Sequence, residues 1–254
     1  MRVILPILAC VLCAGIILVT DSNKDGFLIG NAAAQWLPPS FWAGITTLGS
    51  VYGTFCLIAS TLAWRPRWTA TLLLTVPFGS IYTFGIKKWA DMPRPAAICT
   101  PETFHVIDAT LLEHSFPSGH TLTAFVAAGT VVFCSRQRLA WLALPVAMLV
   151  AFSRIAVGAH WPLDLLAGAA GGWATAAVGC ALSAQWRFWE NAHGQRILAG
   201  IALICVSIFF FEDTQYPRGA WMQHLLCVTC LLGASYALWR PAASSAQNTR
   251  AKPQ

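Results

Sequence analysis

Residues 139–185 read LAWLALPVAMLVAFSRIAVGAHWPLDLLAGAAGGWATAAVGCALSAQ, two long apolar runs separated by a short polar cluster. The two runs, 139–157 and 163–185, each have about the 20 residues that a helix needs to cross the roughly 30 Å hydrocarbon core of a bilayer. The cluster between them contains an arginine, a histidine and an aspartate. Ionisable groups are costly at membrane depth and are therefore candidates for function.

Six further apolar runs flank this stretch, at 3–19, 41–64, 68–86, 118–135, 197–211 and 220–239. The chain of 254 residues is 57% hydrophobic and only 10% charged, whereas soluble domains carry about 25% charged residues. We therefore predict an all-α fold, a polytopic membrane helix bundle with eight spans. The net charge of +6 comes from single Lys and Arg residues at the ends of apolar runs. Since no basic stripe is present, we expect no nucleic-acid partner.

The distribution of basic residues predicts the orientation in the membrane. Eight spans place both termini on one side, and ten of the sixteen Lys and Arg residues fall on that side. Because cytoplasmic loops are enriched in Lys and Arg, we expect cytoplasmic termini and an outer loop at 87–117. The compact chain suggests a bacterial inner membrane, with the outer face in the periplasm. The first run is expected to be a retained helix, because a polar segment rather than a cleavage site follows it.

Three polar clusters interrupt the apolar chain at predicted outer ends of helices. They are KKWADMPRP at 87–95, FPSGH at 116–120, and the segment from Ser153 to Asp164. Lys87, Arg94 and Arg154 are three cations without a comparable group of anions nearby. Converging cations suit a phosphate, and the planar fork of Arg matches its oxygens.

The second cluster adds neutral groups that also suit an anion. Ser118 offers a hydroxyl, Gly119 allows a close approach of the backbone, and a helix that starts after Pro117 presents free N–H groups. Two histidines, His120 and His160, can supply a nucleophile and a proton donor.

Asp164 follows His160 by four residues, and Pro162 can begin a helix between them. At that spacing the carboxylate can accept the imidazole N–H, fix the tautomer and raise the nucleophilicity of the ring.

The three clusters together resemble the pattern of the type 2 phosphatidic acid phosphatase (PAP2) superfamily of membrane lipid phosphate phosphatases. The pattern is Lys-x6-Arg-Pro from Lys87, Pro-Ser-Gly-His from Pro117, and Ser-Arg-x5-His-x3-Asp from Ser153, and no position departs from it. The resemblance covers about residues 40–185. The first helix completes a six-helix PAP2-like core, and two predicted C-terminal transmembrane helices extend beyond it.

The resemblance implies a role for each residue of the pattern. His160 is expected to attack phosphorus and form a phosphohistidine, Asp164 to orient it, and His120 to protonate the leaving oxygen. The residues expected to bind phosphate oxygens are Lys87, Arg94, Ser118, Gly119 and Arg154. No metal and no other cofactor is expected, because cations and N–H groups stabilise the transition state.

The chain is expected to have three parts. A PAP2-like phosphatase core occupies 1–185, a two-helix membrane extension occupies 186–239, and a disordered cytoplasmic tail occupies 240–254. The role of the extension and the oligomeric state stay open. Eight of the nine cysteines lie in apolar runs, where free Cys behaves as a small hydrophobe. Cys99 alone is expected in an aqueous loop.

The predicted partners are the bilayer and a lipid phosphate whose phosphate lies at headgroup level. Undecaprenyl diphosphate is the first candidate by family analogy. Other candidates are phosphatidylglycerol phosphate, phosphatidic acid and the phosphates of lipid A. A phosphotransferase that passes phosphate to an acceptor lipid stays an alternative, because the same residues serve its first half-reaction. A transporter is disfavoured, since the chain lacks the internal repeat and the ionisable residues within spans that transporters carry.

Overall fold

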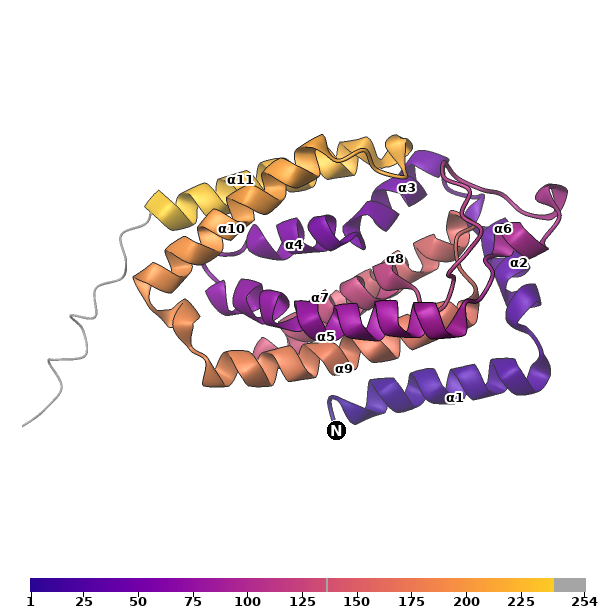
Figure 1. The fold of residues 1–254 in the computed structure, drawn as a ribbon, viewed down its shortest axis with the longest axis horizontal. Coiled ribbons are helices and arrows are strands. Elements are labelled where there is room, and N and C mark those ends of the chain that lie inside the picture. The colour runs from indigo at the N-terminus through magenta and orange to yellow at the C-terminus, as the bar shows by residue number, and fades with distance from the viewer. Residues whose placement is uncertain (136, 240–254) are drawn as a thin grey trace, which may run out of the picture.

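A computed structural model describes residues 1–135 and 137–239, which form helices and connecting loops without a strand (Figure 1). The expected tail at 240–254 lies outside the described residues. The helices are α1 (Ile4–Thr20), α2 (Asn23–Ala34), α3 (Pro39–Leu48), α4 (Val51–Ala59), α5 (Pro66–Ala90), α6 (Pro95–Ile98), α7 (Gly119–Cys134), α8 (Ala143–Ala156), α9 (Pro162–Gln185), α10 (Ala192–Phe211) and α11 (Ala220–Trp239). Short 3-10 helices are η1 (Pro101–Thr103), η2 (Arg138–Leu142), η3 (Phe188–Glu190) and η4 (Pro217–Gly219).

The predicted all-helical membrane fold is confirmed. Five helical segments are long and apolar enough to cross a membrane, at 66–98, 138–156, 162–185, 192–211 and 217–239. Two bent pairs, α1 with α2 and α3 with α4, raise this number to seven if each pair is one span. Helix α7 is apolar but has only 16 residues. Each predicted run therefore contains a helix or a bent pair, and the chain is a multi-pass membrane protein.

The prediction of one continuous span at 41–64 is wrong. Helices α3 and α4 meet at an angle of 71°. Ser50 has an extended backbone, and its side chain accepts a hydrogen bond from the N–H of Gly53 at 3.0 Å. This N-cap starts a new helix, and the Thr54 hydroxyl donates to the carbonyl of Leu48 at 2.6 Å across the break. The local capping residues therefore divide an otherwise apolar run.

Helix α2 begins within the polar segment that follows the first apolar run, where the sequence predicts no span. Phe27 and Asn31 are nevertheless buried. The Asn31 amide donates to the carbonyls of His105 and Ile155 at 2.9 and 3.0 Å, and its oxygen accepts from the N–H of His105 at 2.8 Å. One side chain thereby ties α2 to the long loop after α6 and to α8.

Helix α9 packs against α1, α5 and α7. Its contact with α7 is close because Gly168 and Gly172 face the α7 backbone. A Cβ at these glycines would lie 2.6 Å from the carbonyl oxygen of Ser118 and 2.3 Å from that of Leu122. The close approach places the start of α7 beside the start of α9, where the N–H of Ser118 donates to the carbonyl of Asp164 at 3.0 Å.

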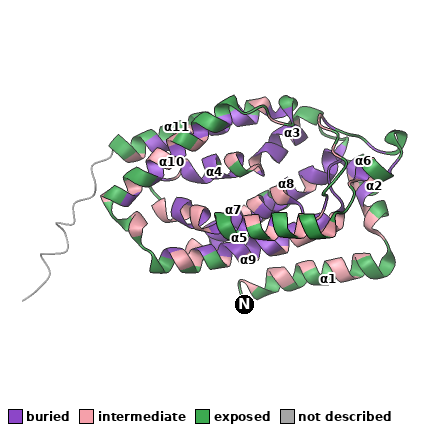
Figure 2. Cartoon of the chain, viewed as in Figure 1, coloured by how far each residue is buried: buried purple, intermediate pink, exposed green. Residues whose placement is uncertain are grey.

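Helices α10 and α11 pack against each other and against α4. Side chains such as Phe55 on α4, Val206 on α10 and Leu226 on α11 share one buried apolar cluster with α7. Buried positions face the interior while the outward sides of the long helices are largely exposed (Figure 2). The exposed sides are rich in large apolar residues, which is the pattern of surfaces that contact lipid.

Candidate active site

His160 lies in the tight turn between α8 and α9. Gly158 starts the turn with φ of 79°, and a Cβ there would lie 2.8 Å from the carbonyl oxygen of His105. Pro162 then opens α9, as the sequence predicts, and places Asp164 in its first turn. Both His160 and Asp164 are only 2% exposed, so their polar atoms depend on protein partners.

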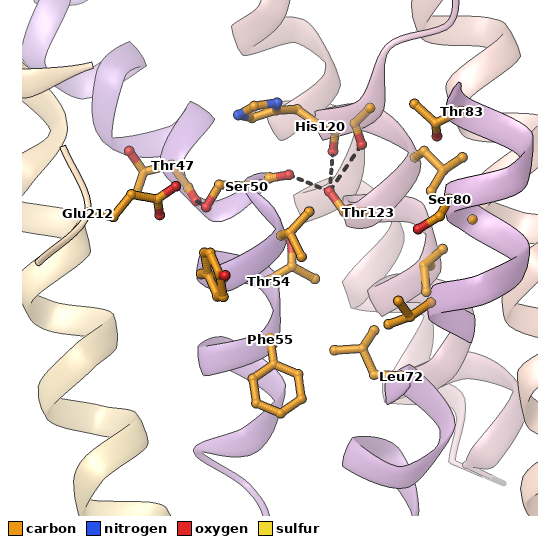
Figure 3. A pocket seen from close by; sticks show the side chains of 18 of the residues that line it. Thr47, Ser50, Thr54, Phe55, Leu72, Ser80, Thr83, His120, Thr123 and Glu212 are labelled. Atoms are coloured by element: carbon orange, nitrogen blue, oxygen red, sulfur yellow. Dashed lines mark hydrogen bonds between the residues drawn. The ribbon is translucent and has the colours of Figure 1, made fainter. Parts of the chain in front are cut away.

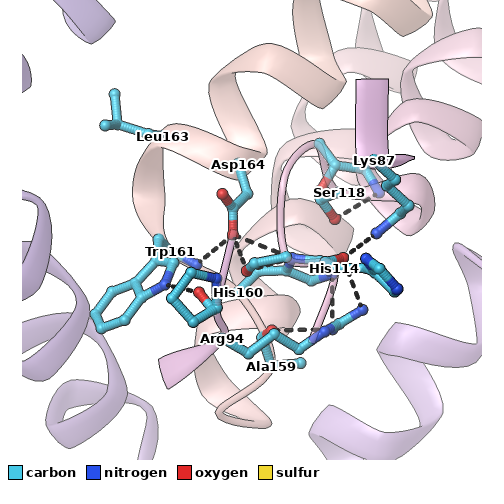
Figure 4. A network of polar contacts seen from close by, with 12 residues as sticks. Lys87, Arg94, His114, Ser118, Ala159, His160, Trp161, Leu163 and Asp164 are labelled. Atoms are coloured by element: carbon cyan, nitrogen blue, oxygen red, sulfur yellow. Dashed lines mark hydrogen bonds and ion pairs between the residues drawn. The ribbon is translucent and has the colours of Figure 1, made fainter. Parts of the chain in front are cut away.

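One oxygen of Asp164 holds the histidine. Oδ2 accepts from Nδ1 of His160 at 3.2 Å, from the N–H of Trp161 at 2.8 Å and from the hydroxyl of Ser115 at 2.5 Å (Figure 4). Since the carboxylate accepts from Nδ1, the proton of the neutral ring is on Nδ1 and the lone pair is on Nε2. Burial, followed by the positive charges of Arg94, Arg154 and Lys87, lowers the pKa of His160 well below its usual value. The ring is therefore neutral at pH 7.

Nε2 of His160 faces a group of cations. Nη1 of Arg94 lies 3.2 Å from it and also donates to the carbonyl of Ala159 at 3.0 Å. Lys87 donates to the carbonyl of His114, which Arg94 also approaches. None of the carboxylates in the described segments forms an ion pair with Lys87 or Arg94. These two cations thus remain electrostatically available to an anion beside Nε2.

Arg154 is the third cation and is almost fully buried, at 1% exposure. Its Nη1 donates to the hydroxyl of Thr46, and its guanidinium lies over the ring of Tyr216 at 5.2 Å from the centroid. Its Nε has no hydrogen-bond partner within the described part of the chain, and no described carboxylate pairs with it. A buried charge without an opposite charge is strongly unfavourable, so this site is suited to an anionic ligand.

The start of α7 completes the candidate site. Ser118 is the N-cap of the helix, and its hydroxyl accepts from the N–H of Thr121 at 3.4 Å. His120, in the first turn, lies within electrostatic range of His160, Arg94, Arg154 and Lys87. Its ring makes no hydrogen bond to any residue that the structure describes, and it is available to a ligand.

A cavity of about 710 Å³ opens beside these residues (Figure 3). Lys87, Gly119 and His120 line it at the site. Further along, apolar side chains of α4, α5 and α7 line it, namely Val51, Phe55, Leu72, Val76, Phe84, Leu122 and Val126. The segment between α10 and α11, 212–216, also contributes to the lining. A cavity that is charged at one end and apolar along its length suits an amphiphile.

The structure thus brings His160, Asp164, Arg94 and Lys87 into one network, with Ser118 hydrogen-bonded beside it. Gly119 and His120 line the adjoining cavity, and the Arg154 guanidinium lies over the ring of Tyr216. Sequence reasoning missed three participants, Ser115, Thr46 and Tyr216, none of which carries a distinguishing spacing. His114 contributes its main-chain carbonyl, while its side chain pairs with Asp91 at 3.0 Å.

The expectation that Cys99 lies in an aqueous loop is wrong. Cys99 is only 6% exposed. It belongs to the buried cluster that contains Phe27 and Phe104, because the loop after α6 folds back against α2. The position of Cys99 in a segment between polar clusters gave no sign of this packing.

Comparison with known proteins identifies the family of the central segment. Residues 68–191 match the family model described as PAP2 superfamily. The lipid A 1-phosphatase of Rhizobium etli is 48% identical over 114 residues, which are 41% of this chain and 46% of that protein. The undecaprenyl-diphosphatase of Sulfolobus acidocaldarius is 37% identical over 75 residues, which are 30% of this chain and 35% of that protein. The matches therefore span a third to under half of these relatives.

Two solved structures share the fold. Aquifex aeolicus LpxE has a TM-score of 0.56 and 27% identity, covering 62% of this chain and 93% of that chain. A transmembrane PAP2 type phosphatidylglycerolphosphate phosphatase from Bacillus subtilis has a TM-score of 0.51 and 19% identity, covering 71% of this chain and 94% of that chain. The second likeness, at its low identity, concerns the fold alone.

Proposed function

Because this chain belongs to the PAP2 superfamily through residues 68–191, we propose that it is a membrane lipid phosphatase whose nucleophile is His160. The observation that carries the proposal is the setting of that imidazole. Asp164 holds Nδ1 at 3.2 Å, and Nε2 faces Arg94 at 3.2 Å. An imidazole lone pair beside unpaired cations is suited to attack on a phosphate that those cations bind.

The reaction has two steps. Nε2 of His160 attacks phosphorus, the bond from phosphorus to the leaving oxygen breaks, and His120 donates a proton to that oxygen. The leaving oxygen belongs to the lipid alcohol of a phosphomonoester or to the remaining phosphate of a lipid diphosphate. The imidazolium that forms keeps its Nδ1–H bonded to Asp164. Water then attacks the phosphohistidine, His120 takes a proton from it, and the N–P bond breaks to release inorganic phosphate. Lys87, Arg94 and Arg154, with the hydroxyl of Ser118 and the N–H of Gly119, bind the phosphate oxygens in both steps.

This activity belongs to the proposed core, residues 1–185, with residues 186–239 as a membrane extension. The apolar cavity beside His120 supports a lipid substrate, because a soluble phosphate ester has no chain to fill it. If a lipid hydroxyl replaces water in the second step, the enzyme is a phosphotransferase, and the first step is unchanged.

Two lipids are the leading substrates. The lipid A 1-phosphatase match is longer and more identical than the undecaprenyl-diphosphatase match, at 48% over 114 residues against 37% over 75. This difference favours the 1-phosphate of lipid A over undecaprenyl diphosphate, the candidate by family analogy. Both carry a phosphate group at the polar end of a lipid with long apolar chains, and both fit the same chemistry.

A substrate panel tests the function. Purified protein is incubated with lipid A, undecaprenyl diphosphate, phosphatidylglycerol phosphate and phosphatidic acid, and released phosphate is measured for each. An acceptor lipid in a parallel reaction detects transfer. We expect release from at least one lipid, with lipid A preferred. Absence of release and of transfer with every lipid would contradict the proposal.

Chelation is expected to leave this activity unchanged. Magnesium sites need several oxygen ligands near the phosphate, and Asp164 is already engaged by His160, Trp161 and Ser115. Within the described ranges, no three His, Cys, Asp or Glu side chains are grouped as metal ligands. Phosphate release before and after exhaustive EDTA treatment measures this. Loss of activity that magnesium restores would refute the metal-independent mechanism.

The active site is expected to face the periplasm. Maleimide labelling of introduced cysteines in intact spheroplasts tests this, and Glu102 is an exposed position on the loop after α6. Glu102→Cys should react with a membrane-impermeant maleimide in intact spheroplasts, above the background of the native cysteines. Gln137→Cys, at an exposed position before α8, is the matched control and should react only after lysis. The reverse pattern would place the chemistry in the cytoplasm and the termini outside.

A further inference from the structure

The segment Glu212–Tyr216 connects α10 to α11 and lies outside the PAP2-matched residues 68–191. All five of its residues line the cavity that His120 and Lys87 also line, and Figure 3 shows Glu212 across the cavity from Thr83. The C-terminal extension therefore supplies one wall of the cavity.

The position of this segment is fixed at both ends. At its start, the Gln223 side chain donates to the carbonyls of Phe209 and Glu212 at 2.5 and 3.0 Å. After its end, Arg218 forms an ion pair with Asp108 at 3.3 Å, and its N–H donates to the same carboxylate. These contacts join α11 to the end of α10, and Arg218 to the loop before α7. They therefore hold residues 212–216 in place as a wall of the cavity.

Tyr216 is the member of this wall that contacts the candidate site directly. It is 3% exposed, and its ring lies under the guanidinium of Arg154 at 5.2 Å. Its hydroxyl is buried and has no hydrogen-bond partner among the described residues. The Nε of Arg154 is unpartnered in the same way. Two buried donors without acceptors, on two side chains in contact, mark a place where a ligand oxygen completes the hydrogen bonding.

We propose that Tyr216 is a substrate-contacting and positioning residue: its ring holds the Arg154 guanidinium in place, and its hydroxyl donates a hydrogen bond to an oxygen of the bound phosphate group. The inference rests on the proposed phosphatase function and assigns a role to the C-terminal extension. A cation over an aromatic face is stabilised most where both are removed from water, as here. A hydrogen bond from a neutral hydroxyl to a charged oxygen is stronger than one between neutral groups.

Two substitutions separate the two contributions. Tyr216→Phe removes only the hydroxyl, whereas Tyr216→Leu removes the aromatic face as well. With the best lipid of the panel, we expect Tyr216→Phe to raise KM about tenfold with little change in kcat. Tyr216→Leu should also lower kcat, about tenfold or more, because Arg154 loses its support. Tyr236→Phe is the matched control. Tyr236 lies on α11 of the same extension, stacks on Trp64 after α4, and its variant should behave as wild type.

Orthovanadate, a phosphate analogue, gives a second measurement that does not depend on turnover. It should inhibit Tyr216→Phe about tenfold more weakly than wild type. It should also raise the unfolding temperature of the variant less than that of the wild type. The increase in unfolding temperature on adding vanadate can be compared between the two proteins even if the variant without ligand unfolds at a lower temperature.

The outcomes separate the two proposals. Wild-type protein that neither turns over a lipid phosphate nor binds vanadate defeats the proposed function. Active wild-type protein with unchanged KM and unchanged vanadate inhibition in Tyr216→Phe defeats the role of Tyr216 alone.

Discussion

His160→Ala is expected to abolish lipid phosphate turnover and to leave no covalent phosphoenzyme. The buried imidazole whose Nε2 faces Arg94 has no substitute close by, because the His120 side chain has no carboxylate to fix its tautomer in the described structure. The measurement uses a lipid radiolabelled in its phosphate, followed by rapid denaturation and detection of label on the protein. His193→Ala, at an exposed position at the start of α10, should label and turn over as wild type.

His120→Ala should behave differently from His160→Ala. Loss of a general acid costs about 10²–10⁴-fold, and label should still appear on His160. A substrate with a good leaving group needs no proton at that oxygen, so it should restore the His120 variant and not the His160 variant. If the substrate restores both variants equally, the assignment of His160 as nucleophile and His120 as general acid is wrong.

Asp164→Asn is expected to lower kcat by about 10²–10⁴-fold, because an amide can donate to Nδ1 and thereby move the proton of the ring to Nε2. The nucleophilic lone pair would then point away from phosphorus. Ser115→Ala is the milder variant for comparison, because it removes one of the three hydrogen bonds to Oδ2 of Asp164 and leaves the carboxylate in place. Its loss should be much smaller. Steady-state kinetics, with circular dichroism to confirm folding, compares the two.

If Asp164→Asn keeps wild-type kcat while remaining folded, the carboxylate does not set the tautomer. Its importance would then be confined to capping α9 through the N–H of Trp161. The Ser115 variant would in that case be indistinguishable from wild type.

The parts of the fold and site that sequence predicted well depend on local signals. Apolar length predicted the membrane helices, and the four-residue spacing from His160 to Asp164, with Pro162 between, predicted the paired geometry at the start of α9. The expectation that a helix begins after Pro117 also holds, with Ser118 as its cap. Each of these features is decided within a few residues of chain, so the local pattern contains the information.

The features that were missed depend on contacts between distant segments. Ser115 reaches Asp164 across 49 positions and Arg154 reaches Thr46 across 108, and no spacing rule reports such pairs. Cys99 is buried because the loop after α6 folds back against α2, and α2 was itself unpredicted. Tyr216 lies in a segment that resembles an ordinary connection between two helices.

The break between α3 and α4 places polar groups on the wall of the cavity beside His120. A helix interrupted within a membrane segment leaves backbone groups that only protein or water can satisfy. Here hydroxyls serve some of them, since Thr54 donates to Leu48, Ser50 to Thr47 at 2.9 Å and Thr123 to Gly49. The same polar positions line the cavity beside His120. The cavity therefore has polar groups along one wall, while the rest of its lining is mostly apolar. In the proposed reaction, the hydrolytic water and the lipid chain would share this one cavity, so that release of the dephosphorylated lipid and hydrolysis of the proposed phosphohistidine would be linked.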